Sequence, residues 1–400
     1  MNLLRKPIKP DMDEQFTNNK SLISILCSQY FLYFGMLGIF LPWFNLYCHH
    51  IGFSGHEIGI ISAVRSVVTV IFPLVWGAVA DRFQARRPIY ILVNFVSASI
   101  WTLYIFTEDF KLMIIITIFY TIFYAPVIAF LEAFAIDVLG QAKKDYGRLR
   151  VWGTIAFIIM VAIFGKIIDF FSIKVILFAI LAGSFLQAVI SLKIPETKVM
   201  NTKAFKVETE FLAKPKTIVF LFCAFLMLVS HGAYYGFFSI HLEEIGCGPV
   251  FIGLCWAFGT ASEIAIMINS RKIFQRFKIE HILVFSLMTA SVRWLILSMS
   301  SSPSIIFLSQ LLHAVTYGTF HVGSILYIDT LAPESAKTTG QAINNALTYG
   351  LGMMVGFFFT GYLFESMGMF KVFGICSIVA LAGGILFFGF YRFEGATNHQ

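Results

Sequence analysis

Apolar stretches long enough to cross a lipid bilayer follow one another along almost the whole chain. A spanning helix needs about 20 mostly apolar residues, and the sequence contains twelve such stretches. They are centred near Phe34, Val68, Phe95, Tyr120, Ile159, Phe178, Phe225, Ala261, Phe285, Thr316, Gly352 and Ile378. The strands of a membrane barrel would instead alternate polar and apolar residues over about ten positions, and no such alternation occurs. We therefore predict an all-α membrane protein with twelve transmembrane helices.

Basic residues are distributed unevenly over the connections between these stretches. Of the 29 lysines and arginines, 23 lie on the side of the predicted membrane that also carries both ends of the chain. Cytoplasmic loops collect Lys and Arg, so both termini are predicted to be cytoplasmic. The net charge of +7 then reflects topology and attraction to anionic membrane lipids. It gives no reason to expect a nucleic-acid partner.

The chain also contains an internal repeat. The stretch from Gly38 to Phe83 recurs as Gly232 to Phe277 at a constant offset of 194 residues, without a gap. The register pairs Ile51-Gly52 with Ile245-Gly246 and Ile58-Gly59 with Ile252-Gly253. Such a match predicts two copies of a six-helix bundle. We expect a cytoplasmic tail at 1–20, the first bundle at 21–194, a cytoplasmic linker at 195–216, the second bundle at 217–392 and a cytoplasmic tail at 393–400.

The sequence lacks the motifs that would supply chemical energy or metal chemistry. It contains no G-x-x-x-x-G-K-[ST] phosphate loop and no H-E-x-x-H zinc motif. The six cysteines form no C-x-x-C pair, so no metal or redox framework is expected. We find no converging nucleophile and base, and we predict neither an enzyme nor a bound cofactor. Parallel repeats of membrane helices are typical of secondary transporters, which bind their solute near the midplane between the repeats.

Several ionisable side chains fall inside the predicted spans. On insertion scales a charge in the bilayer costs roughly 2.5–3.5 kcal/mol, and such charges usually face a cavity or a partner. The candidates are Arg65, Glu132, Asp137, Glu263, Arg293, His313, His321 and Asp329. Structural ion pairs between helices are the alternative explanation. Pairing with basic loop residues suffices for Asp137 and Asp329, which lie near cytoplasmic helix ends.

One predicted span carries a polar stripe. His313, Tyr317 and His321 recur at every fourth position, which places them near one face of a helix. Histidine can change its charge near neutral pH, so this stripe, His321 included, is a candidate for proton coupling. A hydrogen-bonded packing stripe between helices is the alternative.

The loop between the second and third spans resembles a family motif. Residues 77–88 read Gly-Ala-Val-Ala-Asp-Arg-Phe-Gln-Ala-Arg-Arg-Pro. Gly77, Asp81, Arg82 and Arg86 are similar to the G-x-x-x-D-[RK]-x-G-[RK]-[RK] loop of the major facilitator superfamily, in which Gln84 takes the place of the usual glycine. The resemblance implies a twelve-helix fold in two repeats and a gating role for these four residues.

A narrower resemblance covers nearly the whole chain. Glu132, followed eighteen residues later by Arg150, is similar to the Glu and Arg that contact sugar in lactose permease. The resemblance places the chain in the branch of proton symporters that contains lactose permease, the nucleoside permeases and the phenylpropionate permeases. It implies that Glu132 and Arg150 bind substrate and that Phe157 packs on it. Phe157 stands where lactose permease has tryptophan and offers no N–H donor, which disfavours a galactoside.

The second half resembles the same branch at its charged residues. Glu263, Arg293 and His313 match residues that carry proton coupling and substrate affinity in lactose permease. Two positions differ, because Thr316 replaces a carboxylate of that permease and Gln310 replaces a lysine. We therefore expect that Glu263 or the histidine stripe takes the proton, or that coupling differs from that of lactose permease.

These observations predict a proton-coupled transporter that imports a small organic solute, namely a sugar, a nucleoside or an aromatic acid. The sequence around His313 and His321 is closer to the phenylpropionate permeases and favours an aromatic acid. Proton-coupled efflux is the alternative, and a solute sensor that has kept the fold is a more distant one. The resemblance further implies a monomer in the bacterial inner membrane, with the proton as coupling ion and no metal site.

Overall fold

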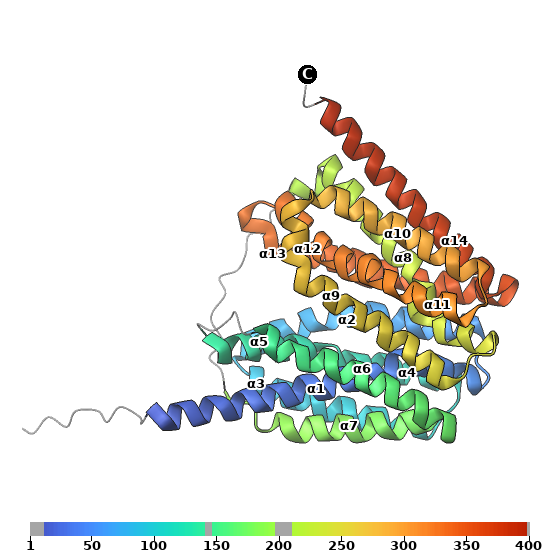
Figure 1. Cartoon of the computed structure of the whole chain (residues 1–400). Coiled ribbons are helices and arrows are strands. Elements are labelled where there is room, and N and C mark those ends of the chain that lie inside the picture. The colour runs from blue at the N-terminus through green and yellow to red at the C-terminus, as the bar shows by residue number, and fades with distance from the viewer. Residues whose placement is uncertain (1–11, 141–145, 197–209, 398–400) are drawn as a thin grey trace, which may run out of the picture.

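The computed structural model describes residues 12–140, 146–196 and 210–397. The backbone of these residues is helical or forms turns and short connections, and none of them lies in a strand. The helices form two bundles, one from each half of the chain (Figure 1). The prediction of an all-α fold is confirmed for this part of the chain.

The first bundle is formed by the helices up to residue 191. They are α1 (Met12–His50), α2 (Gly55–Phe83), α3 (Arg86–Trp101), α4 (Phe110–Tyr124), α5 (Pro126–Leu139), α6 (Tyr146–Phe170) and α7 (Val175–Ser191). α4 and α5 together make one predicted span. The span is divided at Pro126, because proline has no N–H to donate to the preceding turn of a helix.

The second bundle is less regular. Its α-helices are α8 (Pro215–Glu244), α9 (Pro249–Arg276), α10 (Ile279–Met299), α11 (Pro303–Ser309), α12 (Phe320–Leu331), α13 (Lys337–Asn345) and α14 (Met353–Thr397). Two π-helical segments interrupt this half, η5 (Ala314–Thr319) and η7 (Ala346–Gly352). π-Helical turns are rare and occur often at functional sites.

Ten segments of the described chain are long and apolar enough to cross a membrane, and α7 is a shorter apolar helix. One of the ten, Glu334–Phe393, is 60 residues long. It contains a break at Gly368, whose φ of 75° interrupts α14. The protein is therefore a multi-pass helical membrane protein. The number of twelve crossings and the side on which the termini lie stay predictions.

The ends of the helices differ somewhat from the predicted boundaries. α1 begins at Met12, inside the predicted tail 1–20, although its apolar part begins at Ser21. α14 extends to Thr397, beyond the predicted end of the second bundle at 392. Within the predicted linker 195–216, residues 197–209 lie outside the described residues, and α8 begins at Pro215.

The repeat explains how the first two helices of each half are joined. Gly52 follows α1 with a φ of 94°, and its counterpart Gly246 follows α8 with a φ of 86°. These values lie in a region that glycine adopts without strain and other residues avoid. Two residues after Gly52, Ser54 is the N-cap of α2. It forms a reciprocal capping box with Glu57, which satisfies two backbone N–H groups at the start of the helix.

Two close helix crossings join the bundles, and the repeat relates them to each other. α2 packs on α14, where a Cβ at Gly59 would lie 2.7 Å from the backbone oxygen of Phe357. α9 packs on α6, where a Cβ at Gly253 would lie 2.7 Å from the backbone oxygen of Val161. Each helix thus approaches the backbone of the opposite half at a position where only glycine fits. This contact accounts for the recurrence of Ile58-Gly59 as Ile252-Gly253 in the repeat.

The bundles are in contact at one end and diverge toward the other (Figure 1). In α2 every buried residue except Ala80 lies between Gly55 and Val68. In α9 the buried residues all lie between Ile252 and Gly259. The closed end is therefore the one where α2 and α9 begin, and the open end is the one toward the chain termini. If the termini are cytoplasmic, this is an inward-facing state.

A substitution at a crossing tests this arrangement. Gly59→Ala should lower the melting temperature of the detergent-solubilised protein, because overpacking costs about 1–3 kcal/mol. Gly147→Ala is the matched control, since a Cβ at Gly147 of α6 would meet no atom within 4 Å and alanine favours a helix. Equal melting temperatures for the two variants would contradict the close crossing.

Candidate functional site

A cavity of about 290 Å³ lies between the two halves of the protein. Its volume is at the lower end of the range of roughly 300–1,000 Å³ for small-molecule pockets. Eight of its 20 lining residues are aromatic. They are Tyr33, Phe40, Tyr120 and Tyr124 from the first half, and Tyr235, Tyr317, Tyr349 and Phe357 from the second half. Thr69, which also lines the cavity, is exposed, so the cavity is open to the outside of the molecule.

The tyrosines of the first half form a continuous wall. The Tyr33 and Tyr124 rings are stacked with centroids 5.2 Å apart, and Tyr120 stacks on Tyr124 at 5.0 Å. These residues come from two helices, Tyr33 from α1 and the other two from the C-terminal end of α4. The stacking fixes the rings and leaves an apolar surface facing the second half.

Arg65 of α2 is the one charged side chain in the cavity lining. Its guanidinium lies over the Phe40 ring, 4.4 Å from the centroid. A cation in this position is attracted by the ring quadrupole, which is worth roughly 0.5–2 kcal/mol. Among the described residues, no carboxylate forms an ion pair with Arg65. The cavity therefore carries a positive charge that the protein itself neutralises only weakly.

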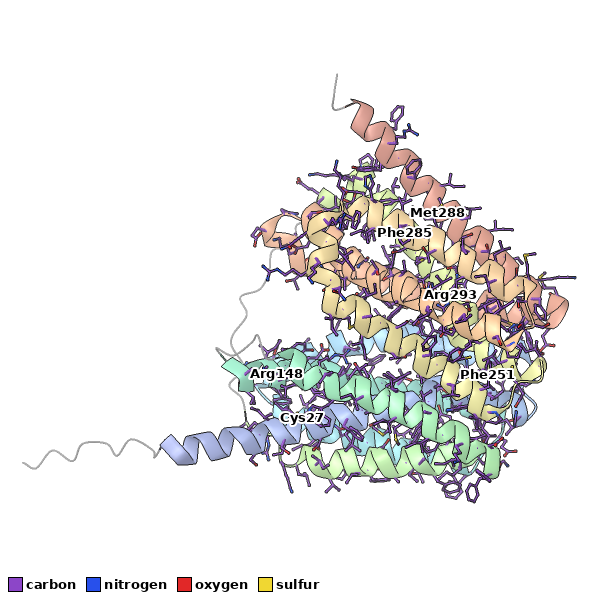
Figure 2. The ribbon with its side chains drawn as sticks, viewed as in Figure 1. Cys27, Arg148, Phe251, Phe285, Met288 and Arg293 are labelled. Atoms are coloured by element: carbon purple, nitrogen blue, oxygen red, sulfur yellow. The ribbon has the colours of Figure 1, made fainter. Side chains whose placement is uncertain are left out.

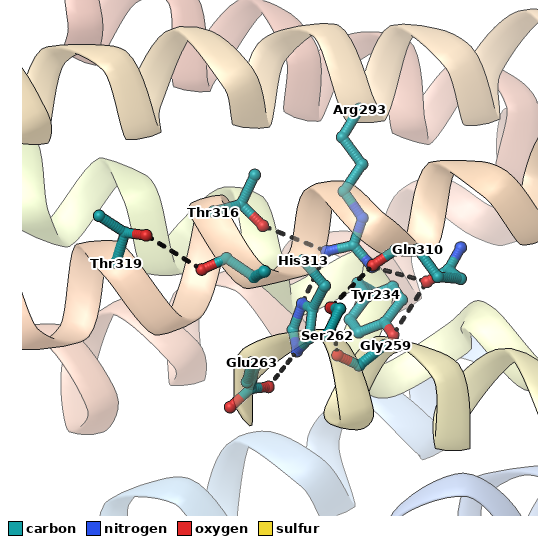
Figure 3. A network of polar contacts seen from close by, with 10 residues as sticks. Tyr234, Gly259, Ser262, Glu263, Arg293, Gln310, His313, Thr316 and Thr319 are labelled. Carbon is teal, nitrogen blue, oxygen red and sulfur yellow. Dashed lines mark hydrogen bonds and ion pairs between the residues drawn. The ribbon is translucent and has the colours of Figure 1, made fainter. Parts of the chain in front are cut away.

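Beside the cavity, the second half contains a buried charge network (Figures 2 and 3). Arg293 of α10 is fully buried among the helices of this bundle. One guanidinium nitrogen contacts His313 Nδ1 at 2.8 Å and Thr316 Oγ1 at 3.3 Å, and the other donates to Gln310 Oε1 at 2.7 Å. On the far side of the imidazole, His313 Nε2 lies 2.8 Å from Glu263 Oε1.

The donors and acceptors of this network define the state of His313. An arginine can only donate hydrogen bonds, so His313 Nδ1 must accept. A neutral imidazole that accepts at one nitrogen carries its proton on the other, so Nε2–H donates to the Glu263 carboxylate. The geometry thus contains one positive guanidinium, a neutral histidine and one carboxylate. Only Glu263 is partly accessible, with 14% of its side chain exposed against 5% for His313.

The predicted polar stripe lies on one face, as expected. His313 and Tyr317 stack with ring centroids 5.4 Å apart, and Tyr317 stacks on His321 at 6.0 Å. His321 Nδ1 contacts the hydroxyl of Tyr349 at 2.6 Å. Since Tyr317 and Tyr349 line the cavity, the stripe connects the buried network with the cavity wall. Its role in proton coupling stays a prediction.

The three predicted substrate residues are not among the residues that line the cavity. Glu132 in α5 accepts a hydrogen bond from the Tyr146 hydroxyl at 3.3 Å. Arg150 in α6 lies over the Phe34 ring at 4.1 Å. Phe157 is buried, and its backbone packs against Gly38 of α1. Their contribution to substrate binding stays a prediction.

Arg150 nevertheless lies near residues of both halves. It interacts electrostatically with Glu132 in its own bundle and with Glu263 and His321 in the other. The ion pairs of the described residues do not include a direct one between Arg150 and either carboxylate. Arg150 is thus placed where a change in the charge of Glu263 would be felt across the interface between the bundles.

The predicted gating loop joins α2 to α3. Gln84, at the position of the family glycine, has a φ of 50° and ends α2 in the left-handed conformation. Glycine is the usual residue for such a helix end, so the backbone keeps the motif although the side chain differs. Arg86 forms an ion pair with Asp137 of α5 at 2.7 Å. Gly77, Asp81 and Arg82 lie in the last two turns of α2, and their gating role stays a prediction.

The two acidic residues at helix ends have basic partners. Asp137 pairs with Arg86, as just described, and Asp329 of α12 pairs with Lys337 at 3.3 Å. These contacts support the structural explanation of both carboxylates.

The sequence identifies Arg65 as an intramembrane charge, but it does not predict that this residue lines the cavity. No motif or spacing connects Arg65 of α2 with the tyrosines of α1, α4 and the second half. The roles of Gln310 and Tyr234 were missed as well. Tyr234 donates to Gln310 at 3.2 Å and lies under the Arg293 guanidinium at 4.2 Å.

The fold resembles that of solved transporters. A crystal structure of the nucleoside transporter NupG superposes with a TM-score of 0.80 at 17% sequence identity, covering 93% of this chain and 99% of that one. The arrangement of two helical bundles around a central cavity is therefore the fold of this transporter.

The sequence shows to which family the chain belongs. The sequence model of the MFS_1 like family matches residues 23–375. The protein belongs to this family. It is therefore a transporter and not an enzyme.

Relatives of the chain include proteins that are named for different solutes. The "Probable 3-phenylpropionic acid transporter" of Escherichia coli (strain K12) is 27% identical over 360 residues, which cover 88% of this chain and 93% of the relative. The "Maltose permease" of Geobacillus stearothermophilus is 23% identical over 360 residues, which cover 88% and 91%. The predicted resemblance to permeases of aromatic acids, nucleosides and sugars is confirmed.

The charge network makes a prediction about stability. Arg293→Lys should lower the melting temperature, since one ammonium cannot replace the planar fork that bonds His313 and Gln310 together. We expect a loss of about 1.5–3 kcal/mol, the usual contribution of a charged hydrogen bond. Arg276→Lys is the control, because Arg276 is exposed near the end of α9. Similar melting temperatures for both variants would show that the network does not stabilise the second bundle.

Proposed function

We propose that the protein is a proton-coupled symporter that imports a small organic solute by alternating access. The observation that carries this proposal is the contact between the cavity and the buried network through the stacked His313 and Tyr317 rings. A solute in the cavity and a proton on the network would lie within reach of each other. Both could then influence the same movement of the two halves.

Glu263 is the residue that we propose to take the proton. In the network its carboxylate balances the guanidinium of Arg293, while His313 is neutral. Protonation of Glu263 would leave one uncompensated positive charge beside the cavity. In a medium of low dielectric constant, this charge would attract an anionic solute, and the solute would favour the proton in return. Such mutual attraction is thermodynamic coupling, which works equally in both directions.

The free-energy cost of moving charges through the membrane explains why the proton and the anionic solute would be transported together. A proton on Glu263 alone would leave excess positive charge in the membrane, and an anion alone would bring negative charge. Together they compensate each other, which lowers the cost of carrying both through the occluded state. Alternating access requires that both ligands favour the same conformational change.

The solute is proposed to belong to one of the classes transported by the relatives, namely aromatic acids, nucleosides or sugars. The name of the Escherichia coli relative points to 3-phenylpropionic acid and that of the Geobacillus relative to maltose. The aromatic walls of the cavity, together with its small volume, favour a solute with a single ring. We further propose a monomer in the bacterial inner membrane, with cytoplasmic termini whose basic loops contact anionic lipids.

Replacing Glu263 tests the coupling. Glu263→Gln keeps an oxygen that can accept from His313 but cannot be protonated near neutral pH. In proteoliposomes we expect the variant to exchange labelled solute at an almost normal rate but to lose uphill uptake driven by an inward proton gradient. The solute would be chosen by a thermal-shift screen with 3-phenylpropionate, maltose and uridine, because a bound ligand raises the melting temperature.

Glu334→Gln is the matched control, since Glu334 is an exposed carboxylate paired with Lys337. It should accumulate solute like the unaltered protein. Uphill uptake by Glu263→Gln would assign the proton to another residue. Uptake by the unaltered protein that ignores the gradient would contradict symport, and accumulation driven only by a gradient in the opposite direction would indicate efflux.

A further inference from the structure

Arg65 is the charged side chain of the cavity lining and takes no part in the proposed proton site. It lies on α2 and is partly exposed toward the cavity. The Phe40 ring covers one face of its guanidinium, but an aromatic face does not take up the N–H donors at the edge of the group. In the described part of the chain, these N–H groups donate no hydrogen bond and no carboxylate pairs with them. The edge of the guanidinium is available for a ligand.

The surroundings of Arg65 show what kind of ligand would fit. Tyr33, Tyr120 and Tyr124 of the first half line the cavity together with Arg65. Across the cavity stand Tyr235, Tyr317 and Tyr349, with Tyr317 edge-on to Tyr235 at 5.8 Å and to Tyr349 at 6.3 Å. Two aromatic walls therefore face each other with a single cation between them. Aromatic rings prefer offset-stacked or edge-to-face neighbours.

We propose that the cavity binds a small aromatic monocarboxylate, whose carboxylate pairs with the edge of the Arg65 guanidinium and whose ring packs between the two tyrosine walls. The guanidinium fork matches the geometry of a carboxylate and can bond both of its oxygens. Because the lining contains no second basic residue, a single negative charge is the best match. A dianion would keep an unpaired charge in the cavity, which is costly.

The position of Arg65 couples this ligand to both halves. The neighbouring Ser66 donates its hydroxyl to the backbone oxygens of Tyr349 and Gly350 at 2.8 and 3.1 Å. The anion site is thus held on α2 at a point where this helix touches the π-helical segment η7 of the other half. A ligand between Arg65 and Tyr349 contacts both halves at once. The inference rests on the proposed function in that the bound anion is taken to be the transported solute.

A binding experiment on the purified full-length protein in detergent, without any proton gradient, tests the proposal. The probes are benzoate and phenylacetate, with benzamide as the uncharged analogue, acetate as the analogue without a ring and cyclohexanecarboxylate as the non-aromatic one. We expect the two aromatic carboxylates to raise the melting temperature in a saturable way. Benzamide and acetate should have no effect, and cyclohexanecarboxylate should bind more weakly than benzoate.

Variants of Arg65 test whether this residue binds the carboxylate of the ligand. Arg65→Gln should weaken the binding of the aromatic carboxylates by about 10- to 100-fold, the effect of losing a charge-assisted hydrogen bond. Arg65→Lys keeps the charge without the fork and should show an intermediate loss. It also serves if Arg65→Gln does not fold. Arg276→Gln is the matched control, because it removes an exposed guanidinium that lies over the Phe277 ring outside the cavity lining, and it should bind benzoate like the unaltered protein. Arg150→Gln tests the competing site that the sequence resemblance implies.

The proposal would be overturned if benzamide or acetate bound as tightly as benzoate, or if none of the aromatic carboxylates bound. It would also be overturned if Arg65→Gln and Arg65→Lys both bound benzoate like the unaltered protein, or if only Arg150→Gln lost binding. These results are independent of proton coupling. If the anion site is wrong, the protein in detergent will not bind aromatic carboxylates in preference to benzamide and acetate. If the proposed symport is wrong, the failure will appear only as missing proton-driven uptake in liposomes with a gradient.

Discussion

The two glycine crossings are the contact on which the rest of the structure depends. Gly59 of α2 and Gly253 of α9 each touch the backbone of the opposite half, and they are the same position of the internal repeat. Van der Waals packing of this kind is a main source of helix association in a bilayer, where the hydrophobic effect does not act between helices. The crossings hold one end of the protein closed, so that the cavity opens toward the other. A transporter that alternates between two states must break such a contact without loss of much free energy, and a small glycine interface suits that purpose.

The repeat also explains why charge is divided between the halves. The packing glycines recur, but Arg65 corresponds to Gly259 and Glu263 corresponds to Thr69. The first half thus presents a cation to the cavity, and the second half holds the carboxylate of the buried network. We propose that the carboxylate of the solute binds to the first half and the proton to the second. A rocking movement between the halves would then change the distance between the two ligands, which gives them a common effect on the equilibrium between states.

The fold and the second-half network followed from local patterns. Long apolar stretches predict spans by themselves, and resemblance pointed to Glu263, Arg293 and His313 together. The cavity could not be predicted, since its walls combine residues far apart in sequence, such as Tyr33 and Tyr349, whose neighbourhood depends on how the bundles meet. The substrate assignment of Arg150 rests on its resemblance to the sugar-contacting arginine of lactose permease. In this chain Arg150 lies over Phe34 and is not among the residues that line the cavity, and its role in substrate binding stays a prediction.

A structure of the protein with a bound aromatic carboxylate tests the central claim most directly. The account predicts both carboxylate oxygens at about 2.7–2.9 Å from the guanidinium of Arg65, with the ring between the tyrosines of the two halves. The same structure should show the Glu263 side chain beside His313, without a direct contact to the ligand. Density for the ligand at Arg150 and Glu132, with the cavity around Arg65 unchanged, would contradict the account.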